Sequence, residues 1–217
     1  MASSRHTKNP IQHRQIRALY DETTVTVYQA YNSAIADAAV GAQRLDASPL
    51  FKPARMTWIK PSWNWMMYRA GYSFKDANQT NILALRLRRG FFEKLLAASV
   101  ESESEEAKRD GEQVRIQWDP ERNVRIQKLS SDGRVRSIQI GIPNGWKGQW
   151  LNEGIVTIED VTDRARQLKK VLDQEPAISE EDLINQGLVP RERIYDLPED
   201  ITRVVGLSKA GDRDLVP

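Results

Sequence analysis

The chain has 217 residues, of which 40% are hydrophobic and 29% are charged, and these values are typical of a globular protein with one sizeable core. The net charge is only +2, and cysteine is absent, which excludes disulfides, thiolate zinc sites and a cysteine nucleophile. The two histidines, His6 and His13, both lie in a polar N-terminal segment. We therefore expect no Ser-His-Asp triad, no bound metal and no cofactor.

Targeting signals are not evident in the sequence. No apolar run approaches the roughly 18 residues that a membrane-spanning helix needs, and the N-terminus has no apolar signal core. We expect a cytoplasmic protein that does not contact a membrane.

The pattern of elements predicts one α+β domain over residues 15–205, between a flexible basic arm at 1–14 and a frayed tail at 206–217. Asn32 or Ser33 is a suitable cap for the first helix, and Gly71 ends the second. In chain order, the predicted elements of the first half are a strand at 23–31, a helix at 33–45, a strand at 55–60, a helix at 63–71, a strand at 81–87 and a helix at 90–99.

The second half predicts a three-stranded antiparallel meander. Its strands, 114–118, 124–129 and 135–142, are separated by connectors with turn chemistry, DPERN and SSDGR. The alternation places Val114, Ile116 and Trp118 on one face, and Arg115 and Gln117 on the other. The other predicted elements are an exposed acidic loop at 101–112, a strand at 154–160 and helices at 161–172 and 178–187, and together they indicate a mixed, mostly antiparallel sheet flanked by helices.

Residues 55–72, RMTWIKPSWNWMMYRAGY, combine three tryptophans, two tyrosines and three cations with no acid. Cations neutralise phosphates and aromatic rings offer faces for stacking bases, so this segment favours a polyanionic partner. Positive charge extends beyond it, because residues 52–94 hold nine Lys or Arg against two acids. The alternative is a buried aromatic helix whose cations are solvated.

Ser62 is the best placed hydroxyl for nucleophilic catalysis. It follows Pro61 at a strand-to-helix junction, where backbone N–H groups could stabilise an oxyanion. The alternative is that Ser62 only caps the helix. With no histidine in the core, its activation would fall to Lys60, Tyr68 or a carboxylate, and Tyr31 is an alternative phenol that projects opposite to Tyr28.

Four segments, YDETTVTVYQAY, RMTWIKPSWNWMMYRAGY, QWDPER and RSIQIG, occur in this order within roughly residues 15–165 and together resemble the family called domain of unknown function 4291. Fungal members of that family are associated with arginine-containing cyclodipeptide synthases, which join arginine and a second amino acid from aminoacyl-tRNAs into a diketopiperazine. The resemblance implies arginyl-tRNA and a second charged tRNA as partners. An aminoacyl ester is already activated, and the chain has neither a GxxxxGK[ST] nor a GxGxxG loop.

Recognition of an arginine side chain needs a carboxylate in fork geometry, for which Asp21, Asp119 and Glu121 are the candidates. The alternatives are that Asp119 initiates a turn and that Glu121 forms an exposed ion pair with Arg122. The remaining candidates for substrate contact are an aromatic ring and two strand amides that would otherwise bridge internal groups: Trp65, Gln29 and Gln139. The cations assigned to tRNA are Arg55, Arg69, Arg86, Arg88, Arg89, Arg122 and Arg136.

Two other functions remain open. The first strand and helix loosely resemble the opening of ADP-ribosyltransferase or RNA phosphotransferase folds, which implies NAD binding and a catalytic glutamate for which Glu159 is the candidate. Alternatively, the chain is a non-catalytic RNA-binding module.

Overall fold

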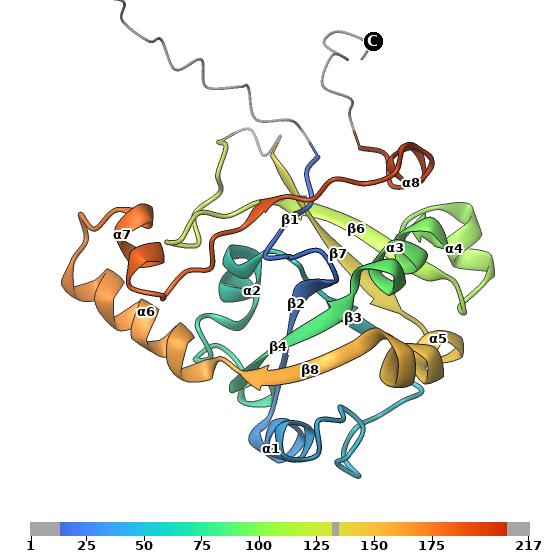
Figure 1. Ribbon diagram of the computed structural model, residues 1–217, viewed down its shortest axis with the longest axis horizontal. Helices are drawn as coiled ribbons and strands as arrows, with labels where there is room; N and C mark the ends of the chain where they lie inside the picture. Colours follow the sequence, from blue (N-terminus) through green and yellow to red (C-terminus); the bar gives the residue numbers. More distant parts are fainter. Residues whose placement is uncertain (1–13, 132–134, 208–217) are drawn as a thin grey trace, which may run out of the picture.

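The computed structural model describes residues 14–131 and 135–207 (Figure 1). The predicted basic arm and frayed tail therefore fall almost entirely outside the described residues, as does most of the SSDGR connector. The described chain is an α+β domain with mostly antiparallel strands, which confirms the predicted class. Within the described residues, no helix combines the length and the apolar composition needed to cross a membrane.

A three-stranded antiparallel sheet forms the centre of the domain. Its order is β2 (Thr24–Tyr31), β4 (Asn81–Arg88) and β8 (Ile155–Asp160). Alternate side chains of β2 and β4 enter two different hydrophobic cores, so both faces of this sheet are covered. The prediction that Tyr28 and Tyr31 project to opposite faces of the sheet is confirmed, because Tyr28 packs in one core and Tyr31 packs against the other.

A four-stranded sheet lies beside it, in the order β3 (Thr57–Ile59), β7 (Arg136–Ile142), β6 (Val114–Pro120) and β5 (Ser99–Glu101). The β5–β6 pair is parallel and the other pairs are antiparallel. Backbone hydrogen bonds between Tyr28 and Lys60 connect the two sheets. The predicted alternation of β6 is confirmed, because Val114 and Ile116 are fully buried whereas Gln117 is exposed.

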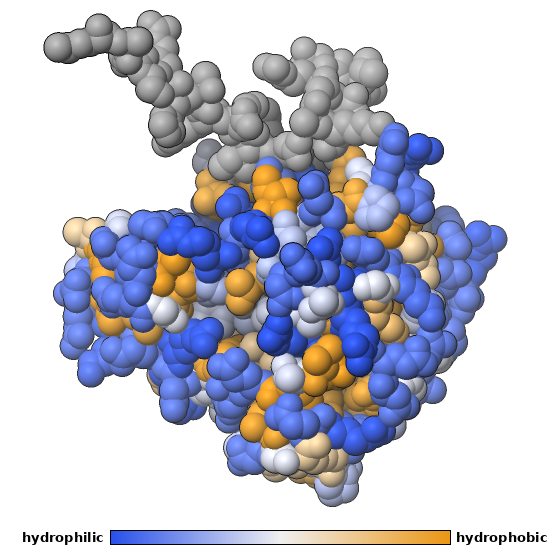
Figure 2. All heavy atoms as spheres, in the orientation of Figure 1, coloured by the Kyte–Doolittle hydropathy of each residue, from blue (hydrophilic) through white to orange (hydrophobic). Residues whose placement is uncertain are grey.

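A two-residue ribbon closes the domain by pairing β1 (Arg17–Ala18) with β9 (Arg193–Ile194). The helices are α1 (Ser33–Ala42), α2 (Trp63–Ala70), α3 (Arg89–Ala97), α4 (Glu105–Arg109), α5 (Asn144–Gln149), α6 (Thr162–Gln174), α7 (Glu180–Asn185) and α8 (Glu199–Val204), with a 3-10 turn at Ala77–Gln79 and a π turn at Trp150–Gly154. Figure 2 shows hydrophilic residues over most of one face, with apolar side chains scattered among them.

The predicted middle strand at 124–129 is wrong, because β6 pairs directly with β7. The Asn123 side chain accepts hydrogen bonds from the N–H groups of Arg125 and Gln127, and Ile126 adopts a left-handed φ of 59°. These local bonds compete with a sheet ladder and fold the segment into a compact loop. The predicted turn at DPERN is also wrong, since Asp119 and Pro120 belong to β6.

The acidic segment 101–112 is not simply a loop, because it contains α4 and the end of β5. Ser104 caps α4 by accepting the N–H of Ala107 at 3.1 Å. Acids in the first turn and cations in the last turn complement the helix dipole, and Ala107 is fully buried. The many charged residues of this segment made its helix signals difficult to recognise in the sequence.

Candidate functional site

The N-terminus of α2 organises the site. Pro61 ends the extended segment after β3, and Ser62 caps the helix by accepting the N–H of Trp65 at 3.2 Å. Gly71 ends the helix in the left-handed conformation, with φ of 55°. The predicted capping role of Ser62 is therefore confirmed.

The Ser62 hydroxyl also has a second partner. Its oxygen donates a hydrogen bond to Oε1 of Glu121 at 3.1 Å, and both residues are almost fully buried. The same Oε1 accepts the N–H of Arg122 at 2.8 Å. Ser62 is thus held in one orientation by a helix N–H and a carboxyl group, which is a geometry suited to a nucleophile and its base.

Glu121 lies at the base of the loop that follows β6. The prediction of an exposed ion pair with Arg122 is wrong, because Glu121 is only 3% exposed. Burial raises the pKa of Glu121, while hydrogen bonds from the Arg122 N–H and the Ser62 and Ser137 hydroxyls oppose this rise. A carboxylate with a raised pKa is a stronger base once it is ionised.

A second carboxyl group reaches α2 from the segment just before β9. Glu192 accepts the N–H of Trp63, the first helical residue, at 2.6 Å. Burial raises the pKa of Glu192 well above its usual range; the Trp63 N–H opposes this rise, whereas the charge of Glu121 adds to it. Two carboxyl groups therefore flank Ser62, one from each side of the helix N-terminus.

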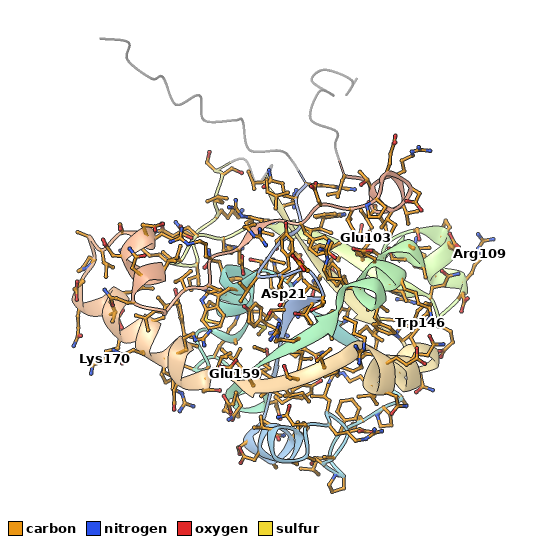
Figure 3. All side chains as sticks on the ribbon, in the orientation of Figure 1. Asp21, Glu103, Arg109, Trp146, Glu159 and Lys170 are labelled. Atoms are coloured by element: carbon orange, nitrogen blue, oxygen red, sulfur yellow. The ribbon has the colours of Figure 1, made fainter. Side chains whose placement is uncertain are left out.

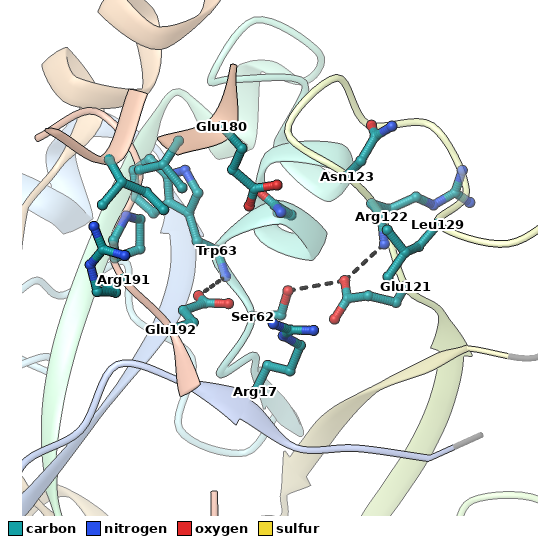
Figure 4. Close-up of a pocket in the computed structure, with 14 residues that line it drawn as sticks. Arg17, Ser62, Trp63, Glu121, Arg122, Asn123, Leu129, Glu180, Arg191 and Glu192 are labelled. Atoms are coloured by element: carbon teal, nitrogen blue, oxygen red, sulfur yellow. Dashed lines mark hydrogen bonds between the residues drawn. The ribbon is translucent and has the colours of Figure 1, made fainter. Parts of the chain in front are cut away.

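These groups line a pocket of about 180 Å³, which we call the Ser62 pocket. Figure 4 shows Arg17 beside Ser62 and between Glu121 and Glu192, with Glu180 across the opening. The charged residues that line the Ser62 pocket are Glu121, Glu180, Glu192, Arg17, Arg122 and Arg191.

Three residues lining the Ser62 pocket carry buried polar atoms without a hydrogen-bond partner among the described residues. They are Trp63 Nε1, Asn64 Oδ1 and Arg122 Nε. Buried polar groups are normally hydrogen-bonded, so unpaired atoms around one cavity indicate a place where a polar ligand would complete the bonding.

A cluster of cations and aromatic rings continues along α2, and we call it the Trp65–Tyr68 cluster. Trp65 meets Tyr68 edge-on, with ring centroids 5.9 Å apart. Lys60 Nζ lies 5.5 Å from the centroid of Trp65, and Arg122 Cζ and Lys75 Nζ lie 3.7 and 5.3 Å from that of Tyr68. Trp65 is only 6% exposed and Lys60 is buried as well, so the alternative of a buried aromatic helix holds for these two residues. The members of the cluster that reach the surface are Tyr68, Arg122 and Lys75, with Arg69 exposed beside them.

Lys60 is not a surface cation, because it is only 6% exposed. Burial, with a smaller contribution from the charge of Arg69, lowers the pKa of Lys60 to about 7, and the charge of Asp119 opposes both. A neutral amine near pH 7 could act as a base, but Lys60 does not line the Ser62 pocket.

Asp119 lies on β6 near Lys60 and Arg136. Its carboxylate accepts Gln139 Nε2 at 2.7 Å and Gln117 Nε2 at 3.2 Å, and burial raises its pKa. Gln139 is thus an internal bridge of the kind that the sequence left open. Neither Asp119 nor Gln139 lines the Ser62 pocket.

Tyr31 and Gln29 lie in the other sheet and bond to each other. The Tyr31 hydroxyl donates to Gln29 Oε1 at 3.2 Å, and Gln29 Nε2 donates to Thr57 and to the Trp58 carbonyl. Burial raises the pKa of Tyr31 to about 12. The structure does not bring either residue to the Ser62 pocket.

Asp21 also lies outside the Ser62 pocket. It accepts the N–H groups of Thr23 and Thr24, and it pairs with Arg86. The backbone bonds from Thr23 and Thr24 lower the pKa of Asp21. Its carboxylate therefore has partners at the start of β2, near the middle of Figure 3.

The predicted tRNA cations divide into two groups, apart from Arg122, which lines the Ser62 pocket, stacks on Tyr68 and donates to the Ile126 carbonyl. Those at the β4–α3 junction have protein partners: Arg86 bonds Asp21, Arg88 donates to the Glu153 carbonyl, and Arg89 donates to the Tyr195 hydroxyl. In contrast, within the described residues the side chains of Arg55, Arg69 and Arg136 form no hydrogen bond or ion pair.

Glu159 is the candidate of the NAD alternative. It lies on β8 near the start of α6, where Figure 3 labels it, and it is exposed and paired with Arg164 at 3.3 Å. It does not line the Ser62 pocket.

Among the residues of the Ser62 pocket that were not predicted as site residues from the sequence, four are charged: Arg17, Glu180, Arg191 and Glu192. Arg17 and Glu192 are delivered by the two-residue β1–β9 ribbon, which is too short to show a periodic pattern. Glu180 lies in the first turn of α7, where acids are common for the helix dipole alone.

A search of curated proteins gave no match to this chain. The family model described as Domain of unknown function (DUF4291) matches residues 15–195. This range runs from β1 to β9 and contains every residue that lines the Ser62 pocket. The chain therefore belongs to the DUF4291 family.

Proposed function

We propose that the protein is a cyclodipeptide synthase that uses aminoacyl-tRNA to make a cyclo-Arg-Xaa diketopiperazine. The observation that carries the proposal is the bond between a buried hydroxyl and a buried carboxyl group, Ser62 and Glu121, in a pocket with two further carboxyl groups. Membership of the DUF4291 family, whose fungal members are associated with arginine-containing cyclodipeptide synthases, supports the same function.

The acceptors around the Ser62 pocket suit an arginine side chain. A guanidinium carries five N–H donors and no acceptor. Glu180 offers carboxyl oxygens at the opening, and Asn64 offers a buried Oδ1 without a partner among the described residues. Carboxylates in this setting would hold a guanidinium through charge-assisted hydrogen bonds.

The first chemical step is an acyl transfer to Ser62. Its oxygen attacks the ester carbonyl of arginyl-tRNA while Glu121 accepts the hydroxyl proton. The ester bond to the terminal ribose breaks, and the ribose oxygen leaves with that proton. The product is an arginyl ester of Ser62 and uncharged tRNA.

Two aminolysis steps complete the ring. The α-amine of the second aminoacyl-tRNA attacks the arginyl ester, which forms the first peptide bond and restores the Ser62 hydroxyl. The α-amine of the arginine residue then attacks the remaining ester, which closes the diketopiperazine and releases the second tRNA. Each attack releases a proton from an amine and delivers one to a departing oxygen, a transfer for which Glu121 is placed.

The tRNA would lie along the Trp65–Tyr68 cluster. In that cluster the exposed Lys75 and the partly exposed Arg122 are suited to phosphates and the partly exposed Tyr68 ring to a base, and the cluster begins one helical turn from Ser62. One helix therefore presents both the acyl site and the nucleic-acid surface.

The test is synthesis from purified components. The protein is incubated with arginyl-tRNA and a mixture of other charged tRNAs, and mass spectrometry is used to look for cyclo-Arg-Xaa. Uncharged tRNA with free arginine should give no product. Ser62→Ala and Glu121→Gln should stay folded and lose most product.

The alternatives give different outcomes. Binding of tRNA without any diketopiperazine would support an RNA-binding module, and stabilisation by NAD would support an NAD-dependent transferase. Full synthesis by Ser62→Ala would leave direct attack of one aminoacyl group on the other, without an ester on the protein.

A further inference from the structure

Arg17 is the arginine of the Ser62 pocket whose side chain has no hydrogen bond or ion pair within the described residues. Each of the other two lining arginines has a side-chain partner. Arg191 pairs with Glu181, and Arg122 stacks on Tyr68 and donates to the Ile126 carbonyl. The charge of Arg17 lowers the pKa of Glu121 and Glu192 without a hydrogen bond to either, so its N–H donors are available to a ligand.

Two independent features place Arg17 at the reacting end of the pocket. The β1–β9 ribbon carries both Arg17 and the segment that holds Glu192. The charge of Arg17 lowers the pKa of Glu121 and of Glu192, the two carboxyl groups that flank Ser62, and Figure 4 shows Arg17 on the opposite side of the opening from Glu180. The positive charge of Arg17 thus lies next to the hydroxyl that would attack, and the acceptors suited to a guanidinium include Glu180 at the other end.

We infer that Arg17 binds the carboxyl end of an arginine ligand, so that the Ser62 pocket takes free L-arginine with its guanidinium toward Glu180 and its carboxylate toward Arg17. The inference rests on the proposed arginine pocket. A guanidinium–carboxylate pair with two parallel N–H···O bonds has both charge and shape in its favour.

The same arrangement has a consequence for catalysis. In an arginyl ester, the carbonyl oxygen would replace one carboxylate oxygen beside Arg17. When Ser62 attacks, negative charge develops on that oxygen, and a fixed cation stabilises the charge more than it stabilises the neutral ester. Arg17 would then lower the barrier of the first acyl transfer.

A ligand series tests the inference without any tRNA. Binding to the full-length protein is measured by calorimetry and by thermal shift with L-arginine, agmatine, L-arginine methyl ester and L-citrulline. Agmatine lacks only the carboxylate, the ester neutralises it, and citrulline lacks the guanidinium charge. We expect L-arginine to bind about tenfold or more tightly than agmatine or the ester, and citrulline to bind weakest, since hydrogen bonds between charged groups are stronger than neutral ones.

Variants then assign the preference to a residue. Arg17→Gln should lower the affinity for L-arginine to that for agmatine and leave the affinity for agmatine unchanged. Glu180→Gln should lower the affinity for both ligands. Arg193→Gln is the matched control, because Arg193 lies on the same ribbon, donates to the Tyr20 carbonyl and does not line the pocket. It should keep the arginine preference.

Several results would overturn the inference. One is equal affinity of the wild-type protein for L-arginine and agmatine, and another is no binding of any of the four ligands. The third is an equal loss of affinity for L-arginine and for agmatine in Arg17→Gln. The wild-type series decides the matter even if Arg17→Gln does not fold. Synthesis from charged tRNA is a separate measurement, so it could succeed while the Arg17 assignment fails.

Discussion

The hydroxyl of Ser62 and the carboxyl group of Glu121 are joined by a 3.1 Å hydrogen bond across 59 residues of chain. One partner begins a helix and the other begins a loop, and both are almost completely buried. Ser62 therefore has two separable roles: a local one in capping α2, and a long-range one in bonding to Glu121.

The first prediction separates these two roles. Ser62→Ala should lower stability by about 1 kcal/mol, the usual cost of a lost cap, with some addition from the lost bond to Glu121. The variant should lose most product formation while its circular dichroism spectrum stays unchanged. Ser104→Ala is the matched control, because Ser104 caps α4 in the same way and does not line the Ser62 pocket. Equal activity losses in the two variants would remove Ser62 from the chemistry.

The second prediction concerns the pH dependence of stability at Lys60. Its pKa is about 7 in the folded protein and 10.5 in its unperturbed state, so the unfolded chain binds more protons between these values. The contribution of this group to the free energy of unfolding should therefore rise with pH between about 7 and 10, by at most ~1.4 kcal/mol for each pH unit. Lys60→Met should lack this rise. Urea unfolding of both proteins at pH 7 and pH 9.5 measures the difference.

Identical pH profiles for the two proteins would contradict a neutral buried Lys60. Burial also raises the pKa of Tyr31 and of Tyr72 to about 12. The contribution of these tyrosines to the pH dependence cancels when the variant is compared with the wild-type protein, because both proteins contain them.

The third prediction concerns Asp21. Since its carboxylate is engaged by Thr23, Thr24 and Arg86, Asp21→Asn should lower the melting temperature at pH 7 and leave the use of arginine unchanged. Because the folded pKa of Asp21 is lowered, its stabilisation is present above the usual value of 3.8 and is lost as the pH falls below it. The gap in melting temperature should close in acid. Glu22→Gln, an exposed neighbour, is the control, and a selective loss of arginine use in Asp21→Asn would restore its predicted role.

The fourth prediction concerns nucleic acid. Replacing Arg55, Arg69 and Lys75 together by Gln should weaken tRNA binding, and it should reduce the slope of log affinity against log salt by roughly one for each phosphate that these cations neutralise. The control removes the same charge from ion-paired surface cations that were not assigned to tRNA, Lys108, Lys169 and Arg203. Filter binding at several salt concentrations gives both slopes. Matching slopes for the two triple variants would move the tRNA surface away from α2.

Local signals predicted the elements well. The strands at β2, β4 and β8 and the caps of α1, α2 and α7 follow from residues that are neighbours in the chain, such as Asn32 and Ser179. The segment 124–129 misled because its alternation imitates a strand, whereas its first residues are bonded to the Asn123 side chain. Periodicity does not detect a side chain that replaces a sheet partner.

The site was predictable only in part. Ser62 and Glu121 were both candidates, but nothing local indicated that they bond to each other. Glu192 contacts Trp63 across 129 residues, and the contact depends on a ribbon of two residues per strand. Such a ribbon is specified by the packing of the whole domain, so its register could not be read from the sequence.

The β1–β9 ribbon also sets an order of events during synthesis on the ribosome. Most of the sheet strands and α2 are translated long before residues 192–195, and domains fold broadly from the N-terminus as they emerge. Until that last segment leaves the exit tunnel, Arg17 has no strand partner and the Trp63 N–H has no carboxylate. A nascent chain would therefore complete its pocket only when it also receives the last core residues, such as Tyr195, and binding competence would appear as a late step of translation.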